Sequence, residues 1–327
     1  MTLEWRARST ALTWSRSNPV AWWWAFLSLT ASTNIALWFW LYRELLPHPM
    51  GSLLGASAAG LVPPAGGAAS APGLEPMLLL CAAYVFGCAF RSFLPRADVQ
   101  RICLFDTWLS SVAVGRSVAT VAEIAFAAQW VIILRQLGAM TGAETTWNVA
   151  AVILPLIVVA ECFSWYAVLT KNFLFNAIEN SLWAVAFFVI GIGLCRLLPE
   201  FEGAVRGALI VTIAGIVGYL AFLMAIDVPM YFNRWRADRA DGIALLTPLA
   251  GLHDASTRWV VTRDFAAWKD EIAWMSLYFS AAVWASLALC VVYAMEARLP
   301  QYRVEAAAIS APAQSVGRAA FQVPALH

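Results

Sequence analysis

The apolar residues of this chain are gathered in long runs, and these runs constrain its fold more than any other feature. Stretches of about 18 or more such residues are typical of helices that cross a hydrocarbon core about 30 Å thick. Of the 327 residues, 61% are hydrophobic and 13% are charged, against about 25% charged in an ordinary soluble domain. The sequence therefore predicts an all-α, polytopic integral membrane protein, with about seven transmembrane helices in one bundle and the lipid bilayer around it.

The predicted spans divide the chain into a transmembrane domain and two tails. They cover residues 20–42, 77–90, 104–137, 149–170, 176–194, 207–226 and 272–295. Residues 47–76 are rich in Gly, Ala, Pro and Ser and contain no Lys or Arg, which predicts a flexible outer loop. Residues 229–270 are expected to form an interfacial connection on the inner side. The transmembrane domain would cover residues 20–296, with an N-terminal tail of residues 1–19 and a disordered C-terminal tail of residues 297–327.

Basic residues favour one orientation of the chain, because loops that stay in the cytoplasm retain more Lys and Arg. With the N-terminus inside, 13 basic residues fall on the inner side and seven on the outer side. We therefore expect a cytoplasmic N-terminal tail. All basic residues except Lys171 and Lys269 are arginine, and alanine is abundant, which together suggest a GC-rich genome. The expected location is a bacterial inner membrane.

Several functional classes find no support in the sequence. The formal net charge is +1 and no basic stripe is present, so a nucleic-acid partner is not expected. The six cysteines show no CxxC pair, and none of the three histidines lies in a predicted span, so neither a metal nor another cofactor is expected. His253 and Asp254 are adjacent and could form an acid/base pair, but neighbouring residues on a loop are more often merely solvated. No pattern therefore favours an enzyme.

Ionisable residues inside the predicted spans are the best candidates for a functional site, because charges at bilayer depth usually face a bundle interior or a wet cavity. Arg116, Thr120 and Glu123 follow the spacing i, i+4, i+7, which places them within about 40° on one helical face. Because the spans alternate in direction, this face and the polar residues of the next three spans converge on one half of the membrane. The candidate binding residues are Arg116, Thr120, Glu123, Glu161, Asn176, Glu179, Asn180 and Asp227.

The cluster allows two interpretations. In the first, Arg116 pairs with Glu123 or Glu161 only to neutralise itself and fix the packing of the helices. In the second, the group lines a vestibule for a polar or charged ligand. The acidic residues outnumber the one embedded arginine, so simple pairing leaves a carboxylate that must be protonated or ligand-bound.

The sequence also predicts how some helices pack. Arg116 should face the spans 149–170 and 176–194, since a lipid-facing arginine at that depth would be costly. Gln129 lies on the opposite face and is expected to tolerate substitution. The glycines at positions 191, 193, 215 and 218 are expected to allow close contact between helices.

The leading functional hypothesis is a carrier or receptor-like binder of a small polar or amphiphilic molecule. The first alternative is a structural or assembly subunit of a membrane complex, in which the same residues lock helices or bind partner helices. The second is a membrane-embedded lipid-modifying enzyme that uses a carboxylate as its acid/base group. A stoichiometric partner in mild detergent would favour the subunit, whereas a bound small molecule would favour the binder.

Overall fold

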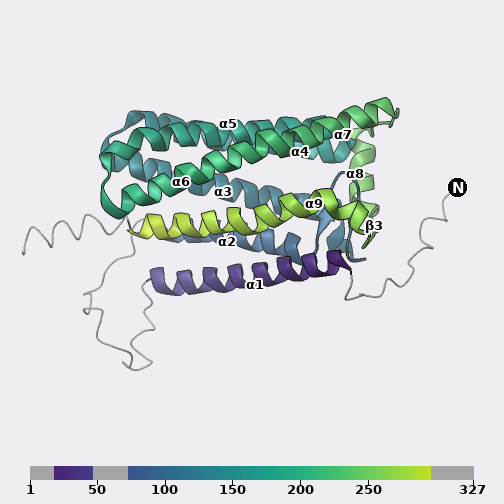
Figure 1. The fold of residues 1–327 in the computed structure, drawn as a ribbon, viewed down its shortest axis with the longest axis horizontal. Helices are drawn as coiled ribbons and strands as arrows, with labels where there is room; N and C mark the ends of the chain where they lie inside the picture. Colours follow the sequence, from purple (N-terminus) through teal and green to yellow (C-terminus); the bar gives the residue numbers. More distant parts are fainter. Residues whose placement is uncertain (1–17, 47–72, 296–327) are drawn as a thin grey trace, which may run out of the picture.

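The fold is a bundle of long helices that lie side by side (Figure 1). The computed structural model describes residues 18–46 and 73–295, so most of the predicted tails and outer loop lies outside the described residues. The first five long helices are α1 (Pro19–Leu45), α2 (Leu74–Phe93), α3 (Val112–Thr141), α4 (Glu144–Thr170) and α5 (Phe173–Leu197). Two composite helices follow, Gly203–Ala240 and Phe265–Met295, which we name helix 203–240 and helix 265–295.

Six of these helices are long and apolar enough to cross a membrane, in agreement with the prediction of an all-α, polytopic membrane protein. α1, the first predicted span, is not among the six, although its 27 residues extend about 40 Å at about 1.5 Å per residue. Polar residues in its middle lower its hydropathy: Ser28, Thr30, Ser32, Thr33 and Asn34. The predicted number of seven spans is therefore not confirmed.

One end of the bundle carries a small sheet and the short helix α8 (Pro248–Thr257), and we name it the sheet end (Figure 1). Strand β1 (Arg96–Ala97) pairs antiparallel with β2 (Ile102–Cys103), and β2 pairs in parallel with β3 (Val260–Val261). α1 begins and α2 ends at this end of the bundle. The sheet was not predicted, because strands of two residues are too short to show an alternating apolar pattern.

α3 begins later than its predicted span, and α2 begins earlier than predicted. The span predicted from Leu104 begins instead at Val112. The residues before it contain β2 and a 3-10 turn, η2 (Trp108–Ser110), and the hydroxyl of Ser111 then caps the first turn of α3. Residues 74–76, predicted as part of the outer loop, form the first turn of α2.

Helix 203–240 continues past the predicted end of its span at residue 226. It consists of α6 (Gly203–Phe222), a π-helical segment η4 (Leu223–Asp227) and α7 (Val228–Ala240). Pro229 has no N–H to donate, and its ring would clash with the carbonyl four residues before it in a regular helix. The wider turns of η4 directly before the proline rearrange the hydrogen bonds there, and the helix continues. Residues 229–240, predicted as the start of the interfacial connection, therefore continue this helix.

The rest of the predicted interfacial connection, up to residue 270, is also largely ordered. It contains α8, β3 and the start of α9 (Phe265–Leu277), which begins seven residues before the predicted span. Helix 265–295 consists of α9, a second π-helical segment, η5 (Tyr278–Ala282), and residues 283–295. Both composite helices thus change their hydrogen-bond pattern at one place.

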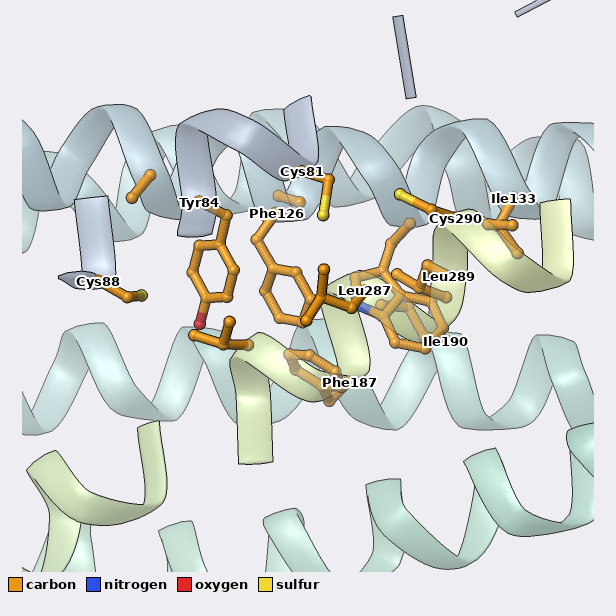
Figure 2. Packing of buried hydrophobic residues seen from close by; sticks show 14 of the residues in the cluster. Cys81, Tyr84, Cys88, Phe126, Ile133, Phe187, Ile190, Leu287, Leu289 and Cys290 are labelled. Atoms are coloured by element: carbon orange, nitrogen blue, oxygen red, sulfur yellow. The ribbon is translucent and has the colours of Figure 1, made fainter. Parts of the chain in front are cut away.

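Aromatic rings from several helices pack in the middle of the bundle (Figure 2). Tyr84 of α2 stacks on Phe126 of α3, with ring centroids 4.5 Å apart. Phe187 of α5 lies 6.3 Å from Phe126 and 4.9 Å from Tyr219 of α6, between ring centroids. The cysteines in the same region are buried and free: Cys81, Cys88 and Cys290. These contacts join α2, α3, α5 and α6 into one core.

Two buried amides connect helices that are far apart in the sequence. Asn34 of α1 donates to the carbonyl oxygen of Phe279 in η5 at 3.2 Å. Gln129 of α3 is fully buried and accepts a hydrogen bond from Ser286 Oγ at 2.5 Å. Gln129 was predicted to tolerate substitution, but its burial and this hydrogen bond lead us to expect the opposite. Gln129 does lie opposite Arg116 on α3, but this face of α3 contacts helix 265–295. Loss of the Gln129 amide would therefore leave buried polar groups unpaired.

Candidate functional site

A cavity of about 570 Å³ lies inside the bundle, within the usual size range of ligand sites. Its walls are formed mainly by α3, α5, helix 203–240 and helix 265–295. Val211 and Arg234 both line it and are roughly 35 Å apart along helix 203–240, at about 1.5 Å per residue, so the cavity is long. Its charged lining residues are Arg91, Asp98, Arg116, Glu123, Glu179, Asp227, Arg234 and Glu271.

Arg116, near the start of α3, is the centre of an ionic cluster. Its Nη2 atom lies 2.7 Å from Glu161 Oε2 of α4 and 3.1 Å from Glu123 Oε2 of α3. Its Nη1 atom lies 3.8 Å from Glu179 Oε1 of α5. Arg116 therefore faces α4 and α5 as predicted, and one guanidinium serves three carboxylates.

Glu161 is held more tightly than the other two carboxylates. The hydroxyl of Thr120 donates to Glu161 Oε2 at 2.6 Å, and the Trp165 indole donates to the same hydroxyl at 3.0 Å. Glu161 is 3% exposed and does not line the cavity. In contrast, Glu123 and Glu179 both line it. The ionic cluster thus has one carboxylate on the packed side and two on the cavity side.

The start of α5 places two amides beside the cluster. Asn172 caps this helix by accepting a hydrogen bond from Leu174 N at 3.1 Å, which fixes where its first turn begins. Asn176 then donates to Glu179 Oε2 at 3.2 Å. Asn180 is buried and lines the cavity on the same helix. These residues form a polar wall next to the two cavity-facing carboxylates.

Asp227 lies apart from the Arg116 cluster, at the last position of η4. Its side chain lines the cavity, and the residue is only 3% exposed. Among residues 18–46 and 73–295, its side chain has no hydrogen-bond partner and no ion-pair partner. Glu271 and Arg234 are its charged neighbours. A buried carboxylate without a partner is unusual and suggests that a ligand completes its surroundings.

Arg234 and Glu271 join helix 203–240 to helix 265–295 near the sheet end. Arg234 Nη1 lies 3.0 Å from Glu271 Oε1, and its Nη2 lies 3.3 Å from Asp270 Oδ2. Glu271 also accepts from Gln100 Nε2 at 2.8 Å and from Trp274 Nε1 at 2.7 Å. This network links the two composite helices at the charged end of the cavity.

A second ionic group joins the last turn of α2 to β1 and to Asp98, the residue directly after β1. Asp98 Oδ2 is 3.5 Å from Arg91 Nη2, and Asp98 Oδ1 is 3.2 Å from Arg96 Nε. Burial raises the pKa of Asp98, but Arg91 and Arg96 more than offset this, so the pKa lies below its usual value. Burial lowers the pKa of Arg96 to about 10, which leaves it charged at neutral pH. Arg91 and Asp98 therefore meet the cavity as an ion pair.

Away from its charged end, the cavity is lined by rings and aliphatic side chains. The aromatic lining residues within the spans include Tyr84, Phe126, Trp130, Trp183, Phe187, Tyr219 and Tyr278. The hydroxyls of Tyr219 and Tyr278 are 2.9 Å apart and link the two composite helices. The cavity thus joins an ionic end to a largely apolar body.

Small residues line the cavity where the two composite helices face each other. These residues are Gly215, Gly218, Ala281, Ala282, Ala285 and Ala288. A Cβ atom added at Gly215 or Gly218 would meet no neighbouring atom within 4 Å, and both glycines are exposed. The prediction of close helix contact is therefore wrong at these two positions. It holds at Gly191, where a Cβ would lie 3.4 Å from Ile216 Cγ2. The cavity opens between helix 203–240 and helix 265–295.

The three glutamates of the ionic cluster also satisfy the simplest requirement for a cation site. Their carboxylate oxygens lie within 4.8 Å of one another. However, Arg116 Nη2 already lies within 3.1 Å of two of these carboxylates, so the guanidinium takes the place that a metal ion would need. The arrangement therefore fits an arginine-centred cluster better than a metal centre.

The structure does not support an acid/base pair at His253 and Asp254. Asp254 is buried and lies 2.8 Å from Arg101 Nε and 3.4 Å from Arg258 Nη1. His253 is exposed on α8. Asp254 therefore links α8 to Arg101, the residue directly before β2.

Most of the candidate residues predicted from the sequence lie in one place in the structure. Arg116, Thr120, Glu123, Glu161, Asn176 and Glu179 lie together in the structure. Asn180 and Asp227 line the same cavity. Sequence reasoning missed Arg234, Glu271 and the aromatic walls. The acidic pair directly before the last apolar run was the only signal for Glu271, and such pairs are equally typical of a solvated loop.

Comparison of the chain with protein-family models, curated proteins and solved structures returns no match, so its function is argued from the geometry of the cavity.

Proposed function

We propose that the chain binds a small amphiphilic molecule in this cavity and carries it through the membrane. The observation behind this proposal is that one long cavity joins an ionic end to an aromatic and aliphatic body. A polar group at the sheet end and an apolar group along the walls would each meet a matching surface. Pockets that combine apolar walls with a few placed polar groups are the usual form of small-molecule sites.

The position of the ionic cluster favours binding over a purely structural role. A cluster that served only to lock helices would be packed on all sides. Arg116, Glu123 and Glu179 instead border the cavity, and their acidic groups exceed the single base. Intramembrane ionisable residues of this kind are typical of substrate and ion pathways.

The opening between the two composite helices suggests how such a molecule would enter. Gly215 and Gly218 leave space, and they line the cavity together with Ala281 and Ala285, none of which carries a charge. An amphiphile dissolved in the bilayer could therefore reach the cavity sideways, without leaving the hydrocarbon region.

We further propose a bacterial inner membrane with the N-terminus and the sheet end on the cytoplasmic side. The described basic residues at the sheet end are Arg91, Arg96, Arg101, Lys171, Arg234, Arg236, Arg239, Arg258, Arg263 and Lys269. Those at the other end are Arg43, Arg135, Arg196 and Arg206. This excess at the sheet end is what the positive-inside rule associates with cytoplasmic loops.

Cysteine labelling in intact cells tests this orientation. In a cysteine-free background, Thr145→Cys, exposed in the first turn of α4, should react with a membrane-impermeant maleimide. Ser256→Cys, exposed on α8, should react only after the cells are opened. Labelling of Ser256→Cys but not Thr145→Cys in intact cells would invert the orientation, and labelling of both from one side would contradict the span order.

Filling the opening tests the proposed binding. The double variant Gly215→Leu/Gly218→Leu should lose a bound amphiphile, because the new side chains would occupy the entrance and part of the cavity. It should still fold, since both positions are free of neighbouring atoms and leucine favours helix more than glycine. Native mass spectrometry of protein released from mild detergent measures the bound molecule.

Gly207→Leu is the matched control. Gly207 lies on the same helix, is also free of neighbours and does not line the cavity, so this variant should retain the molecule. A wild type that carries no non-detergent molecule, or a double variant that retains it unchanged, would argue against the proposal. A stoichiometric protein partner in place of a small molecule would favour a complex subunit.

A further inference from the structure

The charges that line the cavity are unevenly satisfied. Its lining includes three arginines and five acidic residues. Each arginine has a carboxylate partner: Arg91 pairs with Asp98, Arg116 with the glutamate cluster, and Arg234 with Glu271 and Asp270. An anionic ligand would therefore meet only arginines whose charge is already balanced by a neighbouring carboxylate.

The acidic side is in the opposite situation. Within the described parts of the chain, the side chain of Asp227 has no hydrogen bond or ion pair, although the residue is only 3% exposed. The nearest arginine, Arg234, is already committed to Glu271 at 3.0 Å and to Asp270 at 3.3 Å. A cation that entered the cavity would find Asp227 unpaired and would not have to displace any partner.

The rings of the cavity favour the same sign of charge. The face of an aromatic ring carries negative potential and attracts cations, most strongly those that have lost their water. The charged neighbours of Tyr219 include both Asp227 and Glu123. Trp183 and Phe187 line the wall of α5 further along. A positively charged group in this cavity would therefore have aromatic rings as well as the Asp227 carboxylate among its surroundings.

We propose that the ligand of this cavity is an amphiphilic cation, in which an ammonium group contacts Asp227 and an apolar chain extends along the walls between helix 203–240 and helix 265–295. This inference rests on the proposed function and specifies the class of its ligand. The place of Asp227 fits this role, because η4 turns the last residues of the segment out of regular helical register, and π-segments are frequent at functional sites.

Three amphiphiles with the same ten-carbon chain test the sign of charge: decyltrimethylammonium, decyl sulfate and decyl maltoside. Each is titrated below its micellar concentration into the protein in lipid nanodiscs, and calorimetry is corrected with empty nanodiscs. The cation should bind saturably and at least about tenfold more tightly than either of the others. Gly215→Leu/Gly218→Leu should abolish this binding.

Asp227→Asn should weaken decyltrimethylammonium binding at least about tenfold, because the isosteric amide keeps its size but loses the charge. Asp241→Asn, at an exposed aspartate at the end of α7, is the control and should change the affinity by less than about twofold. Asp227→Glu retains the charge and should retain most of the binding. If Asp227→Asn did not fold, the ranking of the three amphiphiles on the wild type would still decide the question.

The two proposals fail in different ways. Equal or tighter binding of decyl sulfate or decyl maltoside, blocked by the Gly215/Gly218 double variant, would overturn the cation inference and leave the binding function standing. Saturable cation binding that Asp227→Asn leaves unchanged would also overturn the inference. If none of the three amphiphiles bound in a way that the double variant removes, the proposed function itself would be wrong.

Discussion

Replacement of Arg116 by methionine is expected to lower the free energy of unfolding by about 3–5 kcal/mol, the range for breaking a buried ion pair by removing one partner. Arg116 is 5% exposed, and its guanidinium lies between three carboxylates whose oxygens are within 4.8 Å of one another. Methionine is apolar and similar in length, so packing is largely kept while the positive charge is lost. The remaining carboxylates would then repel one another in a medium of low dielectric constant unless they took up protons.

Thermal unfolding of the purified protein in one detergent measures this effect. Arg135→Met is the matched control, since Arg135 lies on the same helix, is exposed, and has its guanidinium 5.8 Å from the Trp147 ring centroid. Its loss should change stability by about 1 kcal/mol or less. Adding Glu161→Gln to Arg116→Met should recover part of the stability by removing one of the three acids. An Arg116→Met protein as stable as the wild type would contradict the picture of a buried, charge-balanced cluster.

The ionic cluster could be predicted from the sequence because its geometry follows from helical spacing. Positions i, i+4 and i+7 share a face, and alternating spans bring equivalent depths together. These two rules alone place Arg116, Glu123 and Glu161 in one region. They did not show that Glu179 would also reach the guanidinium, because rotation of one helix against another is set by packing.

Other features lay beyond sequence patterns for identifiable physical reasons. Gln129 was placed on the correct face of its helix, but only tertiary packing decides whether that face contacts lipid or helix 265–295. Pro229 normally ends or kinks a helix, and the π-helical segment before it carries the helix onward. Nothing in the sequence distinguishes an aromatic ring that lines a cavity, such as Trp183, from one that fills a core. The cavity itself was therefore not predictable.

The sequence alone could not assign separate roles to the two mid-membrane glutamates. Glu123 and Glu161 lie at similar depths and both contact Arg116, so spacing treats them alike. In the structure their surroundings differ. The side chain of Glu123 is 25% exposed and lines the cavity, whereas that of Glu161 is 4% exposed and accepts hydrogen bonds from Arg116 and Thr120.

Glu161→Gln and Glu123→Gln are therefore expected to have opposite effects. Glu161→Gln should lower the free energy of unfolding by about 1.5–3 kcal/mol, the range for a buried hydrogen bond to a charged group, and should leave ligand binding intact. Glu123→Gln should change stability by less than about 1 kcal/mol, because Arg116 keeps two carboxylates. It should weaken the binding of a cationic amphiphile, though less than Asp227→Asn does, because it removes a negative charge from the cavity wall while the ammonium group keeps its contact with Asp227. Thermal unfolding and calorimetry of both variants, measured side by side, give the two quantities. A stable Glu161→Gln protein that no longer binds its ligand, next to a Glu123→Gln protein that binds normally, would reverse the assignment and make Glu161 the ligand-binding carboxylate.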